Sequence, residues 1–579
     1  MKHLDLIKSC NNLQDVAFVL GYKPSRLAYI LYKMPNSTKY REFEIDKKLG
    51  GKRKIFAPCP ELKTLQQRLS KLLQNCIAVI NKEKGIQKSI SHGFKRDCSI
   101  FTNAEQHRNK RFVLNIDLED FFGTINFGRV RGFFIKNKNF EIDENAATVL
   151  AQIACFNNSL PQGSPSSPVI TNLISHTMDI RLAALAKQLK CTYSRYADDI
   201  TFSTNEKNFP IELAEPTNAE GTEWKVGKKL ERKIQKLGFS VNHKKTRLQF
   251  SQSRQDVTGL VVNKKVNIKS EYHRSARAMA HSLFKTGKFH IKENKQDANG
   301  NIVETKREGK ITELGGYLNF IDMADKYRKR HVDDYKERRI LSSREEIYRD
   351  FLFFRYFYQP SRPIILCEGK TDYIYLKCAI KSQFSKYPNL CQKNKQDEKI
   401  LKVDFFKYTE VKSRLFSLSG GASTLSTFIG NYTKFCETYS VEISKNPVII
   451  VVDNDMGVNK VFSSAKTKKY GKSKGSNIDG SLPFYHLGEN LYLTAIPKKL
   501  GKDTAIEDYF KPTVLSTKYN GKTFNYKNKT KNVNPKTEYS KAVFAEHVIE
   551  KNRDKIDFSD FTPILDNICA AINDYSKKK

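Results

Sequence analysis

The sequence lacks any apolar run that approaches the ~20 residues needed to span a bilayer. A strongly apolar stretch, Val448–Val452, has only the length of a buried strand. The segment from Met1 to Lys8 has no apolar core of the kind found in signal peptides. The 11 cysteines are scattered, odd in number and never arranged as Cys-x-x-Cys, which argues against a zinc site or a disulfide framework. We therefore expect a cytoplasmic protein with reduced cysteines and no membrane partner.

Negative charge is also scarce. The 579 residues include 101 Lys and Arg against 62 Asp and Glu, a formal net charge of +39, together with 27 Tyr and 37 Phe. Cations can meet the phosphates of a nucleic acid, and aromatic faces can stack on its bases. The chain is long enough for several domains that each bury a core. The composition therefore predicts a multidomain protein that binds nucleic acid.

Carboxylates are concentrated at a few points along the chain. Asp198 and Asp199 are expected at the bend of a β-hairpin within residues 192–203, and fixing two adjacent acids there costs energy unless they hold a cation. Asp117 is expected at the end of a buried strand within residues 112–122. Three carboxylates at one point can hold two Mg²⁺ ions ~3.5–4 Å apart, as in-line nucleotidyl transfer requires.

With a third segment, Leu160–Pro168, the order of motifs resembles the palm of reverse transcriptases over roughly the first 350 residues. The resemblance implies an α+β fold of fingers, palm and thumb like a right hand. It also implies that Asp117, Asp198 and Asp199 are catalytic and bind Mg²⁺, with the Leu118 carbonyl as a further ligand.

The same resemblance implies contacts to the incoming deoxynucleotide. Its candidate residues are Arg53, Arg96, Asp120, Phe122, Gln162 and Lys245. Phe122 would exclude a ribose 2′-hydroxyl, although a core aromatic beside Phe121 is the alternative. Cys98 departs from the family pattern, so either Arg96 or Lys95 can supply a phosphate contact. Lys245 is a candidate proton donor to pyrophosphate or a solvated lysine at a strand end, and Arg53 is a triphosphate ligand or part of a solvated turn.

Two short elements resemble the retron reverse transcriptases more narrowly. Asn103-Ala-x-x-His107 precedes the first palm strand, and Val257-Thr258-Gly259 follows the last. The resemblance implies that these five named residues hold a cognate noncoding RNA. It also implies a product, msDNA, in which cDNA stays joined to that RNA by a branch. Taken alone, His107 would be an ordinary surface or capping histidine.

A second set of acids lies in the C-terminal part. An apolar strand within residues 363–372 is expected to end at Glu368, and a strand within 447–455 is expected to end at Asp453 and Asp455. Carboxyl ends of parallel strands meet at one edge of a sheet, where ligands bind. One glutamate and two aspartates there predict a Mg²⁺-dependent site for phosphoesters.

This pattern resembles the Toprim domain, an α/β fold with a parallel sheet. The resemblance implies that Glu368 handles protons and binds metal, and that Asp453 and Asp455 bind metal. Residues 504–510 resemble an acidic element of overcoming-lysogenization-defect-type nucleases, which adds Glu507 and Asp372 as metal ligands. Glu507 and Asp372 could instead cap helices or pair with lysines.

The expected organisation is fingers and palm over 1–265, a helical basic thumb over 266–358 and a Toprim nuclease over 361–579. Cations proposed to grip duplex backbone in the thumb are Arg328, Lys329, Arg330, Arg338 and Arg339. We expect a bacterial retron reverse transcriptase whose nuclease, restrained by the branched hybrid, defends against phage. Its nuclease target would be DNA or RNA, including transfer RNA, and it would form a homo-oligomer organised by msDNA. The alternatives are a mobile-element reverse transcriptase whose Toprim part assists integration, and a Toprim part that only docks.

Overall fold

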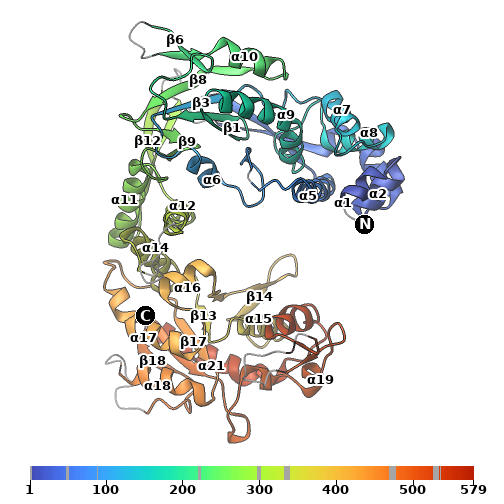
Figure 1. Cartoon of the computed structure of the whole chain (residues 1–579). Coiled ribbons are helices and arrows are strands. Elements are labelled where there is room, and N and C mark those ends of the chain that lie inside the picture. The colour runs from blue at the N-terminus through green and yellow to red at the C-terminus, as the bar shows by residue number, and fades with distance from the viewer. Residues whose placement is uncertain are drawn as a thin grey trace. The chain divides into compact units, whose positions relative to one another are not determined.

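The computed structural model describes residues 3–46, 51–87, 89–218, 223–296, 302–330, 340–467, 477–525, 534 and 536–578. These residues fall into two compact units, 1–270 and 271–579, whose ribbons are shown in Figure 1. The expected thumb cations Arg338 and Arg339 lie outside the described residues. Within the described ranges, the structure contains no helix that is both long and apolar enough to cross a membrane.

The first unit is built on a four-stranded antiparallel sheet in the order β4-β5-β3-β8. Its strands are β3 (Phe112–Leu118), β4 (Thr192–Tyr196), β5 (Asp199–Thr204) and β8 (Val241–Phe250). After Asp199, every residue of β5 is buried, because helices cover one face and the sheet neighbours enclose its edges. The hairpin expected over residues 192–203 is confirmed as β4 and β5.

Helices cover this sheet and a second hairpin precedes it. Leu62, Leu65, Leu69 and Leu72 of α5 are buried at helical spacing, as the sequence predicted. The remaining elements are α1 (His3–Lys8), α2 (Leu13–Leu20), α3 (Pro24–Ala28), a π-helical turn (Tyr29–Lys33), α4 (Asn36–Lys39), β1 (Tyr40–Asp46), β2 (Lys52–Pro58), α5 (Pro60–Glu83), α6 (Ile100–Glu105), α7 (Phe127–Lys136), α8 (Glu144–Ala154), α9 (Ser167–Gln188), β6 (Ala214–Pro216), β7 (Trp224–Val226), α10 (Lys228–Gln235), β9 (Asp256–Val257) and β10 (Leu260–Val261). The basic hairpin expected from residue 50 is β1 paired with β2.

The second unit begins with helices and a two-stranded hairpin. These are α11 (Ser270–Thr286), β11 (His290–Gln296), β12 (Ile302–Glu308), α12 (Ile311–Lys329), α14 (Ser343–Phe353) and a π-helical turn (Phe354–Tyr358). The helices expected to form a thumb therefore share a compact unit with residues 361–579.

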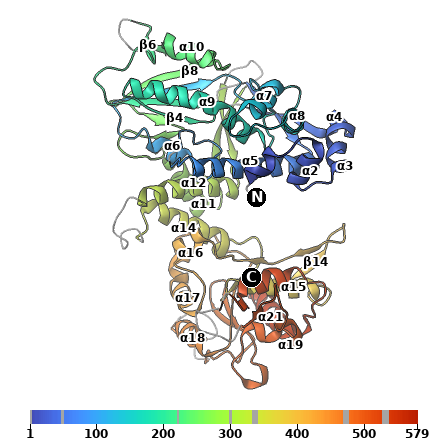
Figure 2. The ribbon, with the colours of Figure 1, turned by 45° about the vertical axis from the view of Figure 1, so that its right-hand side comes forward.

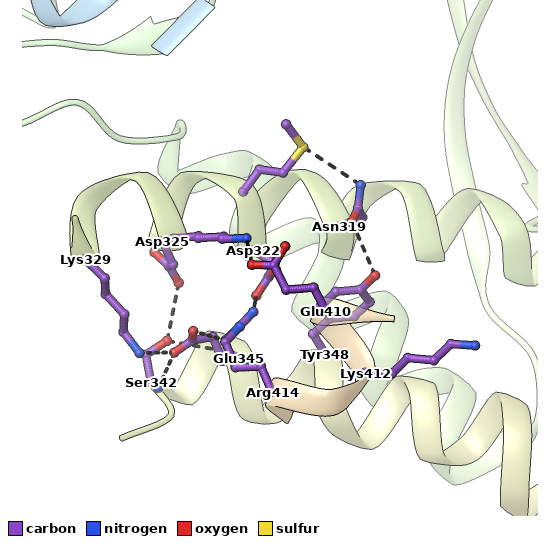
Figure 3. A network of polar contacts seen from close by, with 12 residues as sticks. Asn319, Asp322, Asp325, Lys329, Ser342, Glu345, Tyr348, Glu410, Lys412 and Arg414 are labelled. Atoms are coloured by element: carbon purple, nitrogen blue, oxygen red, sulfur yellow. Dashed lines mark hydrogen bonds and ion pairs between the residues drawn. The ribbon is translucent and has the colours of Figure 1, made fainter. Parts of the chain in front are cut away.

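A buried network of ion pairs joins these helices to the rest of the second unit. Arg414 of α16 (Glu410–Phe416) donates to Asp322 of α12 and to Glu345 of α14, as Figure 3 shows. Lys329 also donates to Glu345, and Arg344 pairs with Asp325. Asp322, Asp325 and Glu345 are at most 3% exposed, so each buried carboxylate has a cationic partner, as burial of charge requires.

The core of the second unit is a five-stranded sheet in the order β16-β13-β17-β19-β18. Strands β16, β13, β17 and β19 are parallel, and β18 joins β19 antiparallel. Every residue of β13, β17 and β19 is buried, as expected for parallel strands covered on both faces. Residues of α15 (Asp372–Ser382) and α21 (Thr562–Lys578) pack with those of β13, β17 and β19 in one hydrophobic cluster. Figure 2 shows α17 and α18 on the left of this unit, away from α15 and α21.

The bounds of these elements follow the predicted alternation of strand and helix. They are β13 (Ile364–Cys367), α15 (Asp372–Ser382), β14 (Cys391–Lys393), β15 (Lys399–Leu401), β16 (Asp404–Phe405), α17 (Ala422–Cys436), β17 (Val448–Val452), a 3₁₀ turn (Met456–Val458), α18 (Asn459–Lys466), β18 (Tyr485–Gly488), β19 (Leu491–Ala495), 3₁₀ turns (Lys499–Gly501 and Ile506–Tyr509), α19 (Pro512–Leu515), β20 (Thr523–Phe524), β21 (Glu538–Tyr539), α20 (Lys541–Val543), a π-helical segment (Phe544–Glu550), a 3₁₀ turn (Ser559–Phe561) and α21 (Thr562–Lys578).

Candidate functional site

The three palm carboxylates come together at one end of the first unit's sheet. In the antiparallel pair β3–β5, Asp117 lies directly opposite Asp199. Side chains opposite each other share a face, with Cβ atoms ~4.5–5.5 Å apart. Asp198 lies in the two-residue turn between β4 and β5, where its backbone carbonyl accepts a hydrogen bond of 3.0 Å from the Leu118 amide. Strand pairing therefore brings Asp117, Leu118, Asp198 and Asp199 together at one end of the sheet.

The turn that carries Asp198 is held tightly. Ala197 has φ +56°, which is unusual for a residue with a side chain. Arg195 is fully buried, pairs with Asp179 at 2.7 Å and donates to the Ala197 carbonyl at 2.9 Å. A Cβ on Gly93 would meet the Ala197 amide nitrogen at 2.5 Å, so only glycine allows this approach. The sequence analysis did not identify Gly93, Asp179 or Arg195 as residues that position this turn. A charged residue inside an apolar strand pattern is nevertheless a signal that could have indicated Arg195.

The electrostatics of the palm disfavour negative charge. Desolvation by the surrounding protein raises the pKa of Asp199 to about 7, with contributions from Asp198 and Asp117, although the residue itself reaches the surface. Burial, followed by the charge of Asp117, also raises the pKa of Asp198. The Lys245 ammonium lies 2.8 Å from Asp117 Oδ2 and offsets part of the charge. Carboxylates crowded in this way are stabilised by a bound cation.

Asp117 and Asp198 line a cleft of about 1390 Å³, which is larger than the ~300–1,000 Å³ typical of pockets for small molecules. Predicted residues on its lining are Arg53, Asp117, Leu118, Asp120, Phe122, Gln162, Asp198 and Lys245. The structure thus gathers nucleotide-binding candidates from β2, β3, β8 and the loop before α9. Arg96 is not among the lining residues; its guanidinium instead contacts Gln74 at 3.0 Å and Asn75 at 3.3 Å on α5. Lys95, its alternative, donates to Ser89 at 2.9 Å.

Phe121 and Phe122 face different environments. Phe121 is 3% exposed and packs against Phe239, whereas Phe122 lines the cleft with Phe94 6.3 Å from its ring. The alternative of a core aromatic therefore describes Phe121 rather than Phe122. Gln162 also lines the cleft, and its carbonyl accepts a 2.8 Å hydrogen bond from the Phe56 amide of β2, which fixes Gln162 against the basic hairpin.

The two elements predicted to hold RNA lie together but differ in exposure. His107 is fully buried between β4 and β5, where its ring nitrogens lie 2.7 Å from Ser203 and Ser194, and Ser194 donates to Asn103 at 2.8 Å. Burial lowers the pKa of His107 to about 3. Both side chains are therefore inside the palm, which disfavours the expected direct contact with RNA.

The second element forms a tight turn beside the first. Val257 is buried, while Thr258 and Gly259 have φ of +47° and +81° between β9 and β10. The Thr258 hydroxyl contacts the Ile100 carbonyl, at the start of α6, at 3.3 Å. Gly259 is exposed. Of the five predicted RNA ligands, the turn alone reaches the surface.

The acids of the second unit converge at the carboxyl ends of β13 and β17. Glu368 directly follows β13, and Asp453 directly follows β17. The Glu368 carboxylate accepts a 3.3 Å hydrogen bond from the Asp453 amide. Asp453 Oδ1 accepts from the Ile506 amide at 2.9 Å, next to Glu507. Asp372, at the start of α15, accepts from the Gly369 amide at 2.7 Å. Parallel pairing of β13 with β17 creates this arrangement.

Burial without full compensation raises the pKa of these acids. Burial, with the charge of Glu507, raises the pKa of Asp372 to about 7. Burial, together with Asp372, Glu507 and Glu368, raises the pKa of Asp453 well above its usual range. Burial and the charge of Asp455 raise the pKa of Glu368. The charges of neighbouring acids thus contribute to the raised pKa values of Glu368, Asp372 and Asp453.

One lysine that the sequence did not indicate enters this cluster. Lys541, at the start of α20, lies 2.8 Å from the fully buried Glu507. Burial opposes its charge, but Glu507, Asp372 and Asp453 outweigh burial and raise the pKa of Lys541. Nothing in the local sequence distinguishes Lys541 from other lysines.

The carboxylate oxygens at both sites have the chemistry that Mg²⁺ prefers. As they stand, no group of three or more His, Cys, Asp or Glu in the described ranges has side chains close enough to hold a metal ion. Lysine ammoniums lie against one carboxylate in each site. The donor set fits a divalent cation, and side-chain rotations would have to bring the oxygens together.

Comparison with known proteins identifies the first unit. The model of the reverse transcriptase (RNA-dependent DNA polymerase) family matches residues 45–267, which include the palm carboxylates. The chain is 33% identical over 277 residues to the retron Ec86 reverse transcriptase of Escherichia coli, covering 47% of this chain and 78% of that protein. It is 31% identical over 327 residues to the retron Mx65 reverse transcriptase of Myxococcus xanthus, covering 54% and 67%.

The fold was also compared with a solved structure of apo telomerase from Candida tropicalis, truncated from its C-terminal domain. The two chains are 15% identical over 41% of this chain and 56% of the telomerase chain, with a TM-score of 0.28. A likeness at that level supports no argument about site or function.

Proposed function

Because this chain belongs to the retron reverse transcriptase family, we propose that its first unit copies a bound noncoding RNA into cDNA at the Asp117, Asp198 and Asp199 site and keeps the product joined to that RNA as msDNA. The observation that carries the proposal is the register of β3 and β5, which sets Asp117 opposite Asp199 with Asp198 in the adjoining turn.

The chain's own residues have distinct roles in this proposal. Bound Mg²⁺ would lower the pKa of the attacking hydroxyl and stabilise charge on the phosphates. Asp117, Asp198 and Asp199 would hold the Mg²⁺, and Arg53, which lines the same cleft, would meet phosphate oxygens. Phe122 limits the space beside the sugar, and Lys245 is placed to give a proton to the leaving pyrophosphate.

The test removes the charge that the palm concentrates. In Asp198→Ala/Asp199→Ala, incorporation of deoxynucleotides on an RNA template should fall by about 10³-fold, since metal stabilisation supplies several kcal/mol. The matched control is Glu206→Ala/Glu223→Ala, two exposed acids outside the cleft, which should keep full activity. Circular dichroism reports that both variants fold. If the Asp198→Ala/Asp199→Ala protein still synthesised cDNA, the catalytic role proposed for these two residues would be wrong.

For the second unit, the supporting observation is that Glu368 and Asp453 meet at the carboxyl ends of parallel strands, with the charges of Asp372, Asp455 and Glu507 close enough to raise the pKa of one or both. This arrangement supports a Toprim-type nuclease dependent on Mg²⁺. Bound metal would stabilise the phosphate that is cleaved, Glu368 would move the proton, and Lys541 would offset charge beside Glu507. The nuclease would be the effector of anti-phage defence, held in check by the branched hybrid.

An isosteric substitution tests this second activity. Asp453→Asn keeps the side-chain oxygen that accepts from the Ile506 amide while removing the charge. Cleavage of supercoiled plasmid, duplex RNA and transfer RNA should all be compared, because the target class is open. Asp453→Asn should no longer cleave the substrate that the wild-type protein cleaves, and it should extend primers as the wild type does. A wild-type protein that cleaves none of them with Mg²⁺ or Mn²⁺ would favour the docking or integration alternatives.

A further inference from the structure

A basic groove lies on the first unit, separate from the polymerase cleft. Its volume is about 830 Å³, and no residue of its lining also lines the cleft. The lining residues are Arg181, Ile211, Glu212, Glu215, Lys228, Lys229, Arg232, Lys233 and Lys236. They come from α9, from α10 and the residue that follows it, and from residues 211–215, which lead into β6.

The packing of α10 determines which way its cations point. Leu230 and Ile234, four residues apart, are fully buried and hold one face of the helix against the core. The cations at 228, 229, 232, 233 and 236 therefore lie on the remaining faces and extend over ~12 Å of helix at 1.5 Å per residue. Arg181, exposed on α9, faces the same groove.

The charge of the groove is poorly compensated. Six cations line it against two acids, Glu212 and Glu215. The Glu215 carboxylate is already engaged, by Lys225 at 3.6 Å and by the Lys228 amide at 3.3 Å. In the part of the chain that the structure describes, no carboxylate lies within ion-pair distance of Arg232, Lys233 or Lys236. Like charges at helical spacing of three or four residues repel one another, so a polyanion would stabilise them.

We propose that this groove binds the phosphate backbone of folded RNA at a distance from the catalytic cleft. The inference deepens the proposed function and rests on it, because an enzyme that copies its own structured RNA must hold the uncopied part outside the cleft. Cations along a helix suit a row of backbone phosphates, and folded RNA is recognised largely through shape and backbone. The concave lining favours a rod-like polyanion over a flat anionic membrane.

The test compares a groove variant with two matched controls. Arg232→Gln/Lys233→Gln removes two charges from the groove, Arg232→Lys/Lys233→Arg keeps them, and Lys63→Gln/Lys71→Gln removes two exposed charges from α5. Affinity for a labelled RNA hairpin is measured by fluorescence anisotropy at several salt concentrations. The groove variant should bind about tenfold more weakly, and its plot of log affinity against log salt should be shallower by about one to two. Both controls should match wild type.

Other probes decide between occupants. Unchanged RNA affinity in the groove variant, or an equal loss in the α5 control, overturns the proposal. A loss seen only with a DNA duplex, or only with vesicles containing anionic lipid, assigns the groove to that partner and overturns the RNA assignment. Primer extension on a short generic template should be unaffected by the groove variant. If wild type extends no primer yet binds RNA through the groove, the polymerase proposal fails while the groove survives.

Discussion

The Lys245 ammonium lies 2.8 Å from Oδ2 and 3.2 Å from Oδ1 of Asp117, so a lysine rests against both oxygens of the first palm carboxylate. The second unit repeats the arrangement, with Lys541 2.8 Å from Glu507. A fixed cation beside crowded carboxylates lowers their mutual repulsion. It also competes with any metal ion for the same oxygens.

The first prediction follows from that competition. Lys245→Met should bind Mn²⁺ about fivefold more tightly than wild type when no nucleotide is present, because a half-exposed ion pair contributes roughly 1 kcal/mol. Electron paramagnetic resonance of free Mn²⁺ measures this affinity. The control is Lys244→Met, a neighbouring lysine that lines the cleft. Equal Mn²⁺ affinity in the two variants would show that Lys245 does not compete.

The second prediction concerns the sugar of the incoming nucleotide. Phe122 lines the cleft, so Phe122→Val should open space for a 2′-hydroxyl and reduce discrimination against ribonucleotides by about 10- to 100-fold. Single-nucleotide incorporation with dNTP and rNTP measures the ratio of kcat/KM values. Phe121→Val is the contrast: it should destabilise the buried core and leave the ratio unchanged. A preserved ratio in an active Phe122→Val enzyme rules out the steric gate.

The third prediction uses the buried histidine. The pKa of His107 is about 3 in the folded state against an ordinary value of 6.5, so the unfolded chain binds more protons between those values. The contribution of neutral His107 to the free energy of unfolding is therefore fully present above pH 6.5. It decreases as the pH falls, and at pH 5 the protein is less stable by about 2 kcal/mol. His107→Gln should lack this component. Urea unfolding of both proteins at pH 7 and pH 5 measures the difference, and identical pH dependence would contradict the buried, neutral assignment.

Activity assays separate a structural role of His107 from an RNA-binding one. Because the side chain supports β4 and β5, His107→Gln should impair initiation on the cognate RNA and extension of a generic primer to the same extent. A loss confined to initiation would support RNA recognition instead.

Local sequence patterns were sufficient for the strands that carry the acids. Two apolar-rich runs with an acid pair at the bend predicted β4 and β5, and short apolar runs predicted β3, β13 and β17, because these signals depend on neighbours in the chain. Asn103 and His107 were predicted to hold RNA, but their burial depends on contacts with Ser194 and Ser203, which lie about 90 positions away in the sequence and leave no local mark.

Contacts between distant residues were beyond the reach of these patterns. Arg195 and Asp179 pair across 16 positions, and Arg414 meets Asp322 across 92. Neither partner carries a local mark of the other. The same reason explains why Lys541 was missed and why the helices of residues 271–358 were not expected to share a unit with the C-terminal sheet.

The last prediction separates the two proposed activities. Glu368 lies in the second unit and the palm acids lie in the first, so each set can be changed alone. Glu368→Ala should abolish nuclease activity, toxicity and phage protection while branched cDNA is still made. Asp198→Ala should stop cDNA synthesis but leave the nuclease acids intact, without the nucleic acid proposed to restrain them.

The control for Glu368 should be another glutamate of the second unit that lies outside the acidic cluster. Glu398→Ala removes an exposed acid elsewhere in the same unit and should preserve both activities. Phage plating measures protection, and gel analysis of extracted nucleic acid measures branched cDNA in the same cells. Because Glu368 accepts from the Asp453 amide, Glu368→Gln serves as a second variant that keeps an acceptor and guards against misfolding. If both Glu368 variants fold and still protect cells, the second unit does not act by cleavage, and a docking role accounts better for its buried acids.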